Sequence, residues 1–83
     1  MKKATYKIKE TEYSERLYRR GVVLREEHIV DYHAACSIYE RFIFESEPAP
    51  GCYCVVRMYD KMGILLYQKQ IERGSKCNKN FTQ

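Results

Sequence analysis

The sequence predicts a small α+β domain in which one helix packs on one face of an antiparallel sheet of about four strands. Several short segments alternate between apolar and polar residues, as strands with one buried face do. One central segment instead repeats its apolar residues with the 3.6-residue period of a helix. The 83 residues suffice for one domain with a thin core. The expected order is therefore strand, strand, helix, strand, strand (ββαββ).

The first strand is expected over residues 4–10, where Tyr6 and Ile8 would face the core. Lysines would occupy its outward side, at Lys7 and Lys9. Residues 11–18 are polar with scattered aromatic rings, so they are expected to form a connection.

The second strand is expected to run from Arg19 to Glu26. Its alternation would turn Val22 and Leu24 inward. The outward side would carry Arg19, Val23 and Arg25. Gly21 indicates a bulge or a close approach of another part of the backbone, because only glycine lacks a side chain there.

The helix is expected to begin near Val30 or Asp31, with the Asp31 carboxylate accepting free amide protons of the first turn. Five residues would form its apolar stripe: Ala35, Ile38, Tyr39, Phe42 and Ile43. The opposite side would carry His33, Ser37, Glu40 and Arg41. Phe44 breaks the pattern, and the proline-containing segment 46–51 should end the helix.

A β-hairpin is expected over residues 51–72, with Asp60 and Gly63 at the ends of its turn. Aspartate can bond the turn backbone, and glycine accepts a positive φ. This turn would pair Tyr59 with Leu65, Arg57 with Tyr67, and Val55 with Lys69.

The two faces of that hairpin differ in chemistry. The predicted core face carries Cys52, Cys54, Val56, Met58, Ile64 and Leu66. The other face would carry Tyr53, Arg57, Tyr59, Tyr67 and Lys69, with Val55, Leu65 and Ile71 among them. Together with Lys7, Lys9, Arg19 and Arg25, these aromatic and basic residues form the predicted contact surface for a partner or a nucleic acid.

Composition and charge restrict the class of protein. The net charge is +4, but residues 26–47 hold six acids and one base, so a basic side and an acidic side are expected. No apolar run approaches the ~20 residues that span a bilayer. The basic N-terminus lacks the apolar segment of a signal peptide, so a cytoplasmic protein without membrane contact is expected.

The cysteines and histidines give little indication of a metal site or of nucleophilic catalysis. Reduced structural thiols are expected at Cys36, Cys52, Cys54 and Cys77. The alternative is a zinc site built from these cysteines with His28 or His33, although a C-x-C within a strand is not the usual spacing. A nucleophilic pair of His33 with Cys36 has no evident orienting group. We therefore expect no enzyme activity and no cofactor.

The first ten residues, Met1-Lys2-Lys3-Ala4-Thr5-Tyr6-Lys7-Ile8-Lys9-Glu10, and the order of elements resemble small phage anti-CRISPR proteins. The resemblance implies a non-catalytic inhibitor that occupies a nucleic-acid-binding groove of a Cas protein or ribonucleoprotein complex. It carries over no individual functional residue.

The predicted organisation is one domain over residues 1–73, followed by a flexible basic tail at 74–83. The expected function is a phage or mobile-element protein that docks on and modulates a nucleic-acid-handling complex such as a CRISPR-Cas effector. Two alternatives stay open. One is direct binding of single-stranded RNA or DNA, and the other is a structural homodimer.

Overall fold

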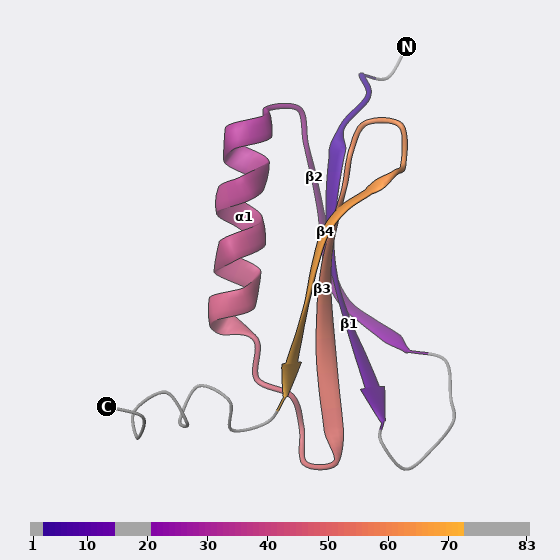
Figure 1. The fold of residues 1–83 in the computed structure, drawn as a ribbon, viewed down its shortest axis with the longest axis vertical. Coiled ribbons are helices and arrows are strands. Elements are labelled where there is room, and N and C mark those ends of the chain that lie inside the picture. Colours follow the sequence, from indigo (N-terminus) through magenta and orange to yellow (C-terminus); the bar gives the residue numbers. More distant parts are fainter. Residues whose placement is uncertain (1–2, 15–20, 73–83) are drawn as a thin grey trace.

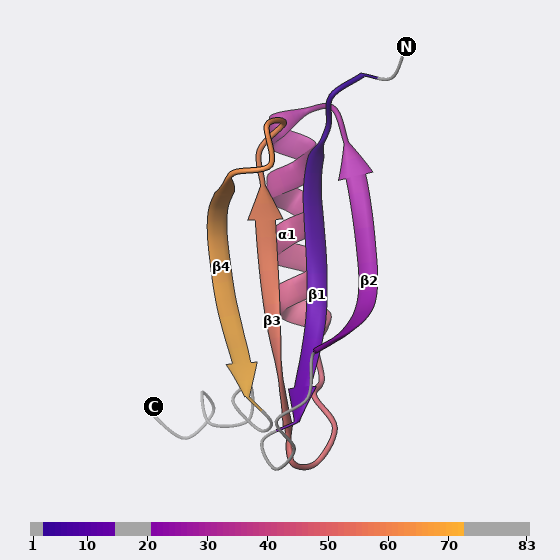
Figure 2. The ribbon, with the colours of Figure 1, turned by 90° about the vertical axis from the view of Figure 1, so that its right-hand side faces the viewer.

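A computed structural model describes residues 3–14 and 21–72, which form one antiparallel sheet with a helix on one face (Figure 1). The elements are β1 (Tyr6–Ser14), β2 (Val22–Ile29), α1 (Tyr32–Glu45), β3 (Cys52–Tyr59) and β4 (Leu65–Glu72). The four strands lie side by side in the order β2-β1-β3-β4 (Figure 2). The predicted fold class and element order are therefore confirmed.

Strand β1 is longer than its alternating segment predicted. It continues to Ser14, and all of its residues from Lys7 onward pair with β3. Residues 11–14 therefore belong to the sheet, and their prediction as a connection is wrong. A central strand is hydrogen-bonded on both sides, so its polar residues can remain in the sheet without an apolar repeat.

Helix α1 begins where its capping residue predicts. The Asp31 carboxylate accepts a hydrogen bond from the backbone N–H of Ala34 at 2.8 Å. Ala35 and Phe42 are buried, while Phe44 is 77% exposed. No helix within residues 3–14 and 21–72 has the length and hydropathy needed to cross a lipid bilayer.

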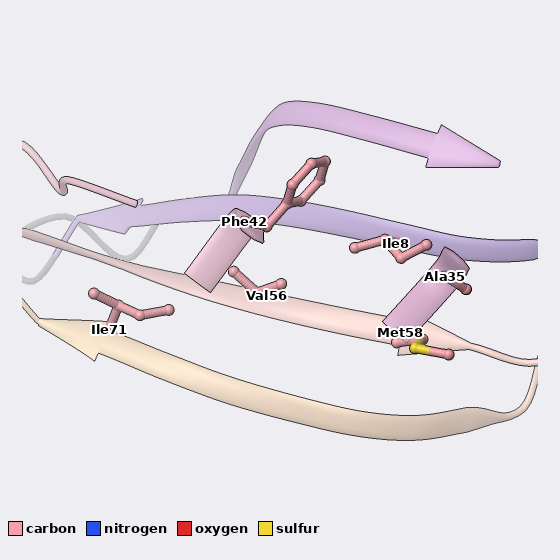
Figure 3. Packing of buried hydrophobic residues seen from close by; sticks show 6 residues of the cluster. All are labelled: Ile8, Ala35, Phe42, Val56, Met58 and Ile71. Atoms are coloured by element: carbon pink, nitrogen blue, oxygen red, sulfur yellow. The ribbon is translucent and has the colours of Figure 1, made fainter. Parts of the chain in front are cut away.

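The core lies between α1 and the strands that it covers. Figure 3 shows side chains of the helix and of three strands gathered in this layer. They are Ile8, Ala35, Phe42, Val56, Met58 and Ile71. Each fully buried large apolar side chain contributes roughly 1.5–3 kcal/mol, so this small cluster must supply much of the stability of the fold.

The turn between β3 and β4 has the predicted chemistry. The Gly63 N–H donates to the Asp60 carbonyl at 3.0 Å, and Gly63 has a φ of 87°. The Asp60 carboxylate accepts from the N–H groups of Met62 and Ile64 at 2.8 and 2.9 Å. Aspartate and glycine thus fix the turn as expected.

A β-bulge in β4 reverses the predicted faces of that strand. Tyr59 pairs with Leu65 as predicted, but Met58 pairs with Tyr67, which leaves Leu66 as the extra residue. Every residue after the bulge therefore points to the side opposite to its prediction. Lys69 pairs with Val56 on the helix side, and Ile71 becomes a core residue.

A second bulge changes the faces of β2. Glu10 pairs with Arg25 and Thr11 pairs with Val23, so Leu24 is the extra residue. Arg25 consequently lies on the helix side, and its predicted outward position is wrong. Leu24 is 48% exposed, so its predicted core position is also wrong. The bulge lies close to Gly21, where the sequence predicted an irregularity.

Candidate binding surface on the open sheet face

The side of the sheet away from α1 is here named the open face, and Figure 2 looks onto it with the helix behind. Opposed residues of antiparallel strands lie on the same face, so the register of β1 and β3 defines its centre. The opposed pairs there are Lys7 with Tyr59, Lys9 with Arg57, Thr11 with Val55, and Tyr13 with Tyr53. Strand β4 adds Gln68 and Gln70, which oppose Arg57 and Val55.

Arg57 connects three strands of the open face. Its Nη1 donates to the Tyr13 hydroxyl at 3.0 Å, and its Nε donates to Gln68 Oε1 at 3.2 Å. The Tyr13 ring stacks on the Tyr53 ring, with centroids 5.4 Å apart and planes inclined by 22°. The guanidinium and the two rings therefore form one ordered aromatic and cationic group.

The two lysines of β1 gather around Tyr59 at the other end of this face. Lys7 Nζ lies 4.8 Å from the centroid of the Tyr59 ring, and Lys9 Nζ lies 5.8 Å from it. These distances are within the range of cation–π attraction. The Tyr59 ring of β3 is thus accompanied by two positive charges.

A hollow of about 440 Å³ opens beside the tyrosine stack. Its lining consists of Tyr13, Tyr53, Val55, Arg57, Gln68 and Gln70. Val55 is only 7% exposed although it lies on the open face, because the longer side chains around it shield it. An apolar residue among aromatic rings, amides and a guanidinium suits a planar group with polar edges.

Gly21 allows the chain to pass close to this group. A Cβ atom at Gly21 would lie 2.4 Å from Thr11 Cγ2 and 2.5 Å from Tyr13 Cε1. Any larger residue would therefore displace the Tyr13 ring. The close approach predicted at Gly21 is confirmed, and it positions a ring of the open face.

An acidic residue bounds the basic centre on the β2 side. His28 Nε2 and Glu26 Oε2 are 2.6 Å apart, and this hydrogen bond lowers the pKa of Glu26. Lys7 and Lys9 lower the pKa of Glu26 further through their charges. Glu26 is thus ionised at neutral pH, and its negative charge lies beside the lysines of β1.

Arg25 performs a structural role on the helix side. Its Nε donates to Glu10 at 2.6 Å, its Nη1 donates to Glu45 at 2.8 Å, and its Nη2 donates to the Phe42 carbonyl at 3.3 Å. Burial opposes its charge, but the hydrogen bonds to Glu45 and Glu10 outweigh that effect and raise the pKa of Arg25. Its placement on the predicted contact surface is wrong.

Tyr67 and Lys69 also lie on the helix side. The hydroxyls of Tyr67 and Tyr32 are 2.9 Å apart, and this hydrogen bond raises the pKa of Tyr32. The Tyr67 ring lies 5.9 Å from that of Tyr39, whose pKa is raised by burial. The prediction that Tyr67 and Lys69 share a face with Arg57 is therefore wrong, since the bulge at Leu66 turns them away.

The remaining predicted contact residues lie together on the open face: Tyr53, Arg57, Tyr59, Lys7 and Lys9. Arg19 lies outside the described residues. Sequence reasoning missed Tyr13, Gln68 and Gln70. Tyr13 continues the alternation of Lys7 and Lys9. Extending the predicted first strand by this alternation would have placed Tyr13 on the same face as the two lysines.

The cysteines of residues 3–14 and 21–72 belong to α1 and to helix-side positions of β3. Burial raises the pKa of the Cys54 thiol, which faces the helix side. Cys36 and Cys52 are partly buried free thiols, and Cys77 lies outside the described residues, as does the predicted tail. Within residues 3–14 and 21–72, no three His, Cys, Asp or Glu side chains form a group that could hold a metal ion.

Comparison with known proteins identifies no relative. No protein-family model matches the chain, and no curated protein or solved structure shows significant similarity to it. The resemblance of the first strand to anti-CRISPR proteins stays a prediction. The geometry of the open face is thus the basis for the function proposed below.

Proposed function

We propose that this protein is a non-catalytic binding module that holds single-stranded RNA or DNA on its open face. The observation that supports this function is the group formed by the stacked Tyr13 and Tyr53 rings, the bridging Arg57 and the hollow beside them. Exposed bases stack on aromatic rings and guanidinium planes, while polar side chains bond their edges.

The arrangement of charge supports the same ligand. Lys7, Lys9 and Arg57 lie on adjacent positions of the two central strands. Tyr53 and Tyr59 are six residues apart on β3, which corresponds to about 20 Å along the strand. A single strand lying along β3 would therefore place bases at both rings and phosphates near the cations between them.

Fluorescence anisotropy with labelled single-stranded RNA and DNA tests this proposal. We expect affinity that falls as salt increases, because phosphate binding releases counterions. Tyr53→Ala should weaken binding by about 1–3 kcal/mol, the usual value of one stacked base. Tyr67→Ala removes a tyrosine from the helix side of the same sheet and is the matched control, with unchanged affinity expected.

Lack of binding at low and at physiological salt would refute the nucleic-acid proposal. The same face would then be a protein-docking surface, as the predicted association with a nucleic-acid-handling complex requires. A pull-down that captures a ribonucleoprotein and is lost with Arg57→Glu would support that second function. Circular dichroism of each variant would establish that the fold is retained.

A further inference from the structure

The polar side chains of the hollow have their hydrogen-bonding atoms oriented by neighbours within the sheet. Strand β4 lies beside β3 on the open face (Figure 2). Gln68 and Gln70 of β4 oppose Arg57 and Val55 of β3, and all four line the hollow. Both glutamines are exposed. The orientation of each amide therefore determines whether the hollow presents a donor or an acceptor at that position.

Arg57 orients the amide of Gln68. A guanidinium has only donors, so the Gln68 atom that lies 3.2 Å from Arg57 Nε is the carbonyl oxygen. The amide nitrogen of Gln68 is then left to donate to a ligand. Arg57 bonds Tyr13 through Nη1 and Gln68 through Nε, and in the described part of the chain these are its hydrogen-bond partners, which leaves Nη2 to donate to a ligand. This end of the hollow therefore presents donors from two side chains.

Glu72 orients the amide of Gln70 in the opposite sense. Gln70 Nε2 donates to Glu72 Oε2 at 3.1 Å. A carboxylate only accepts, so the nitrogen and not the oxygen of this amide must face Glu72. The carbonyl oxygen of Gln70 is then left to accept from a ligand. The order around the hollow is consequently donor from Arg57, donor from Gln68 and acceptor from Gln70.

The complement of this order is a base edge with two neighbouring acceptors followed by a donor. Guanine has such an edge, since its N7 and O6 accept and its N1–H donates. Adenine and uracil alternate acceptors and donors along their edges, so neither offers two neighbouring acceptors. Cytosine offers O2 and N3 followed by its amino group, but on a single ring. The second ring of guanine provides more surface for stacking against tyrosine.

We propose that the hollow selects a guanine base of the bound single strand. This inference rests on the proposed function and names the base that the same site prefers. Arg57 and Gln68 donate to guanine N7 and O6, and Gln70 accepts from N1–H. Gln68 and Gln70 are two residues apart, which is about 7 Å along the strand, so their long side chains can reach one base from both positions. Val55 supplies an apolar contact between them and the tyrosine stack.

Competition measured by fluorescence anisotropy tests the preference with short single-stranded oligouridylates. The strands differ at one central base, which is guanine, cytosine, adenine or uracil. We expect the guanine strand to bind at least about tenfold more tightly than the adenine and uracil strands, and more tightly than the cytosine strand. Equal affinities, or tightest binding of another base, would overturn the guanine preference and leave the proposed function in place. Absence of binding by every strand would overturn both.

Base analogues test the individual contacts without changing the protein. 7-Deazaguanine replaces N7 by a C–H group, so it should bind at least about fivefold more weakly than guanine. Hypoxanthine lacks only the 2-amino group and keeps N7, O6 and N1–H, so it should bind like guanine. Undiminished affinity for 7-deazaguanine would overturn the arrangement of donors and acceptor proposed for the hollow.

Two variants of β4 test the acceptor. Gln70→Leu removes the amide, whereas Glu72→Ala keeps Gln70 but releases its amide from the fixed orientation. Both should reduce the ratio of guanine to uracil affinities, with the larger reduction in Gln70→Leu. The affinity for oligouridylate alone reports whether general binding is retained. Tyr67→Ala changes the helix side and should leave the ratio unchanged. An unaltered ratio in Gln70→Leu would overturn the role of Gln70 in selecting guanine.

Discussion

Replacing Arg25 with methionine should destabilise the fold while leaving nucleic-acid binding intact. Arg25 joins β2 to Glu10 of β1 and to Glu45 and the Phe42 carbonyl of α1. Its guanidinium also lies 4.0 Å from the centroid of the Phe42 ring. Methionine keeps much of the side-chain stem, so the loss would arise mainly from the charge and its hydrogen bonds.

The magnitude follows from the burial of the partner. The Glu10 side chain is 4% exposed, so removing Arg25 leaves a carboxylate without its cation in the interior. Breaking a buried ion pair costs about 3–5 kcal/mol. The Arg25 side chain is 33% exposed and its bond to Glu45 is accessible to solvent, so we expect a smaller loss of about 2–3 kcal/mol.

Urea unfolding at pH 7 measures this loss as a change in the extrapolated free energy of unfolding. Arg41→Met is the matched control, because Arg41 bonds Glu27 at 2.9 Å with both side chains about half exposed. This exposed pair should contribute less than about 1 kcal/mol. Adding Glu10→Gln to Arg25→Met should recover part of the stability, since the unpaired charge is removed. Equal losses in the Arg25 and Arg41 variants would refute the assignment of Arg25 as the partner of a buried carboxylate.

Three further predictions concern single residues. Asp31→Ala should cost about 1 kcal/mol in thermal or urea unfolding, because the first turn of α1 loses its cap; an unchanged midpoint would contradict this. Gly63→Ala should cost about 1 kcal/mol, since its φ of 87° strains any residue with a Cβ, although no atom lies within 4 Å of the added carbon. Cys54 should react with iodoacetamide more slowly than Cys36 or Cys52, as peptide mass spectrometry can measure, because it is fully buried and its pKa is raised. Because the pKa of Cys54 is raised in the folded protein, its contribution to the free energy of unfolding is fully present below the ordinary thiol pKa and is lost as pH rises above it. Cys54→Ala should reduce this pH dependence.

The sequence predicts the elements well because local chemistry determines them. Asp31 caps the helix, and Asp60 with Gly63 forms the turn through bonds within a few residues. The apolar stripe of α1 places Ala35 and Phe42 in the core as predicted. None of these features depends on which strand lies beside which.

The faces of β2 and β4 are predicted poorly because the sequence does not give the position of a bulge within a strand. One extra residue, Leu24 or Leu66, exchanges the two sides of every position beyond it. Ile71 offered a hint, since simple alternation placed it among outward polar residues, whereas in the structure it is 5% exposed. The candidate site therefore retains the residues of β1 and β3 and loses Arg25, Tyr67 and Lys69.

The bridging position of Arg57 has an entropic consequence for binding. A long side chain that is free in solution loses about 0.5–1.5 kcal/mol when a ligand immobilises it. Arg57 is already held between Tyr13 and Gln68, and the Tyr13 ring is held by stacking on Tyr53. Most of this conformational cost is met during folding, so a ligand would encounter a preorganised surface and retain more of its contact energy as affinity.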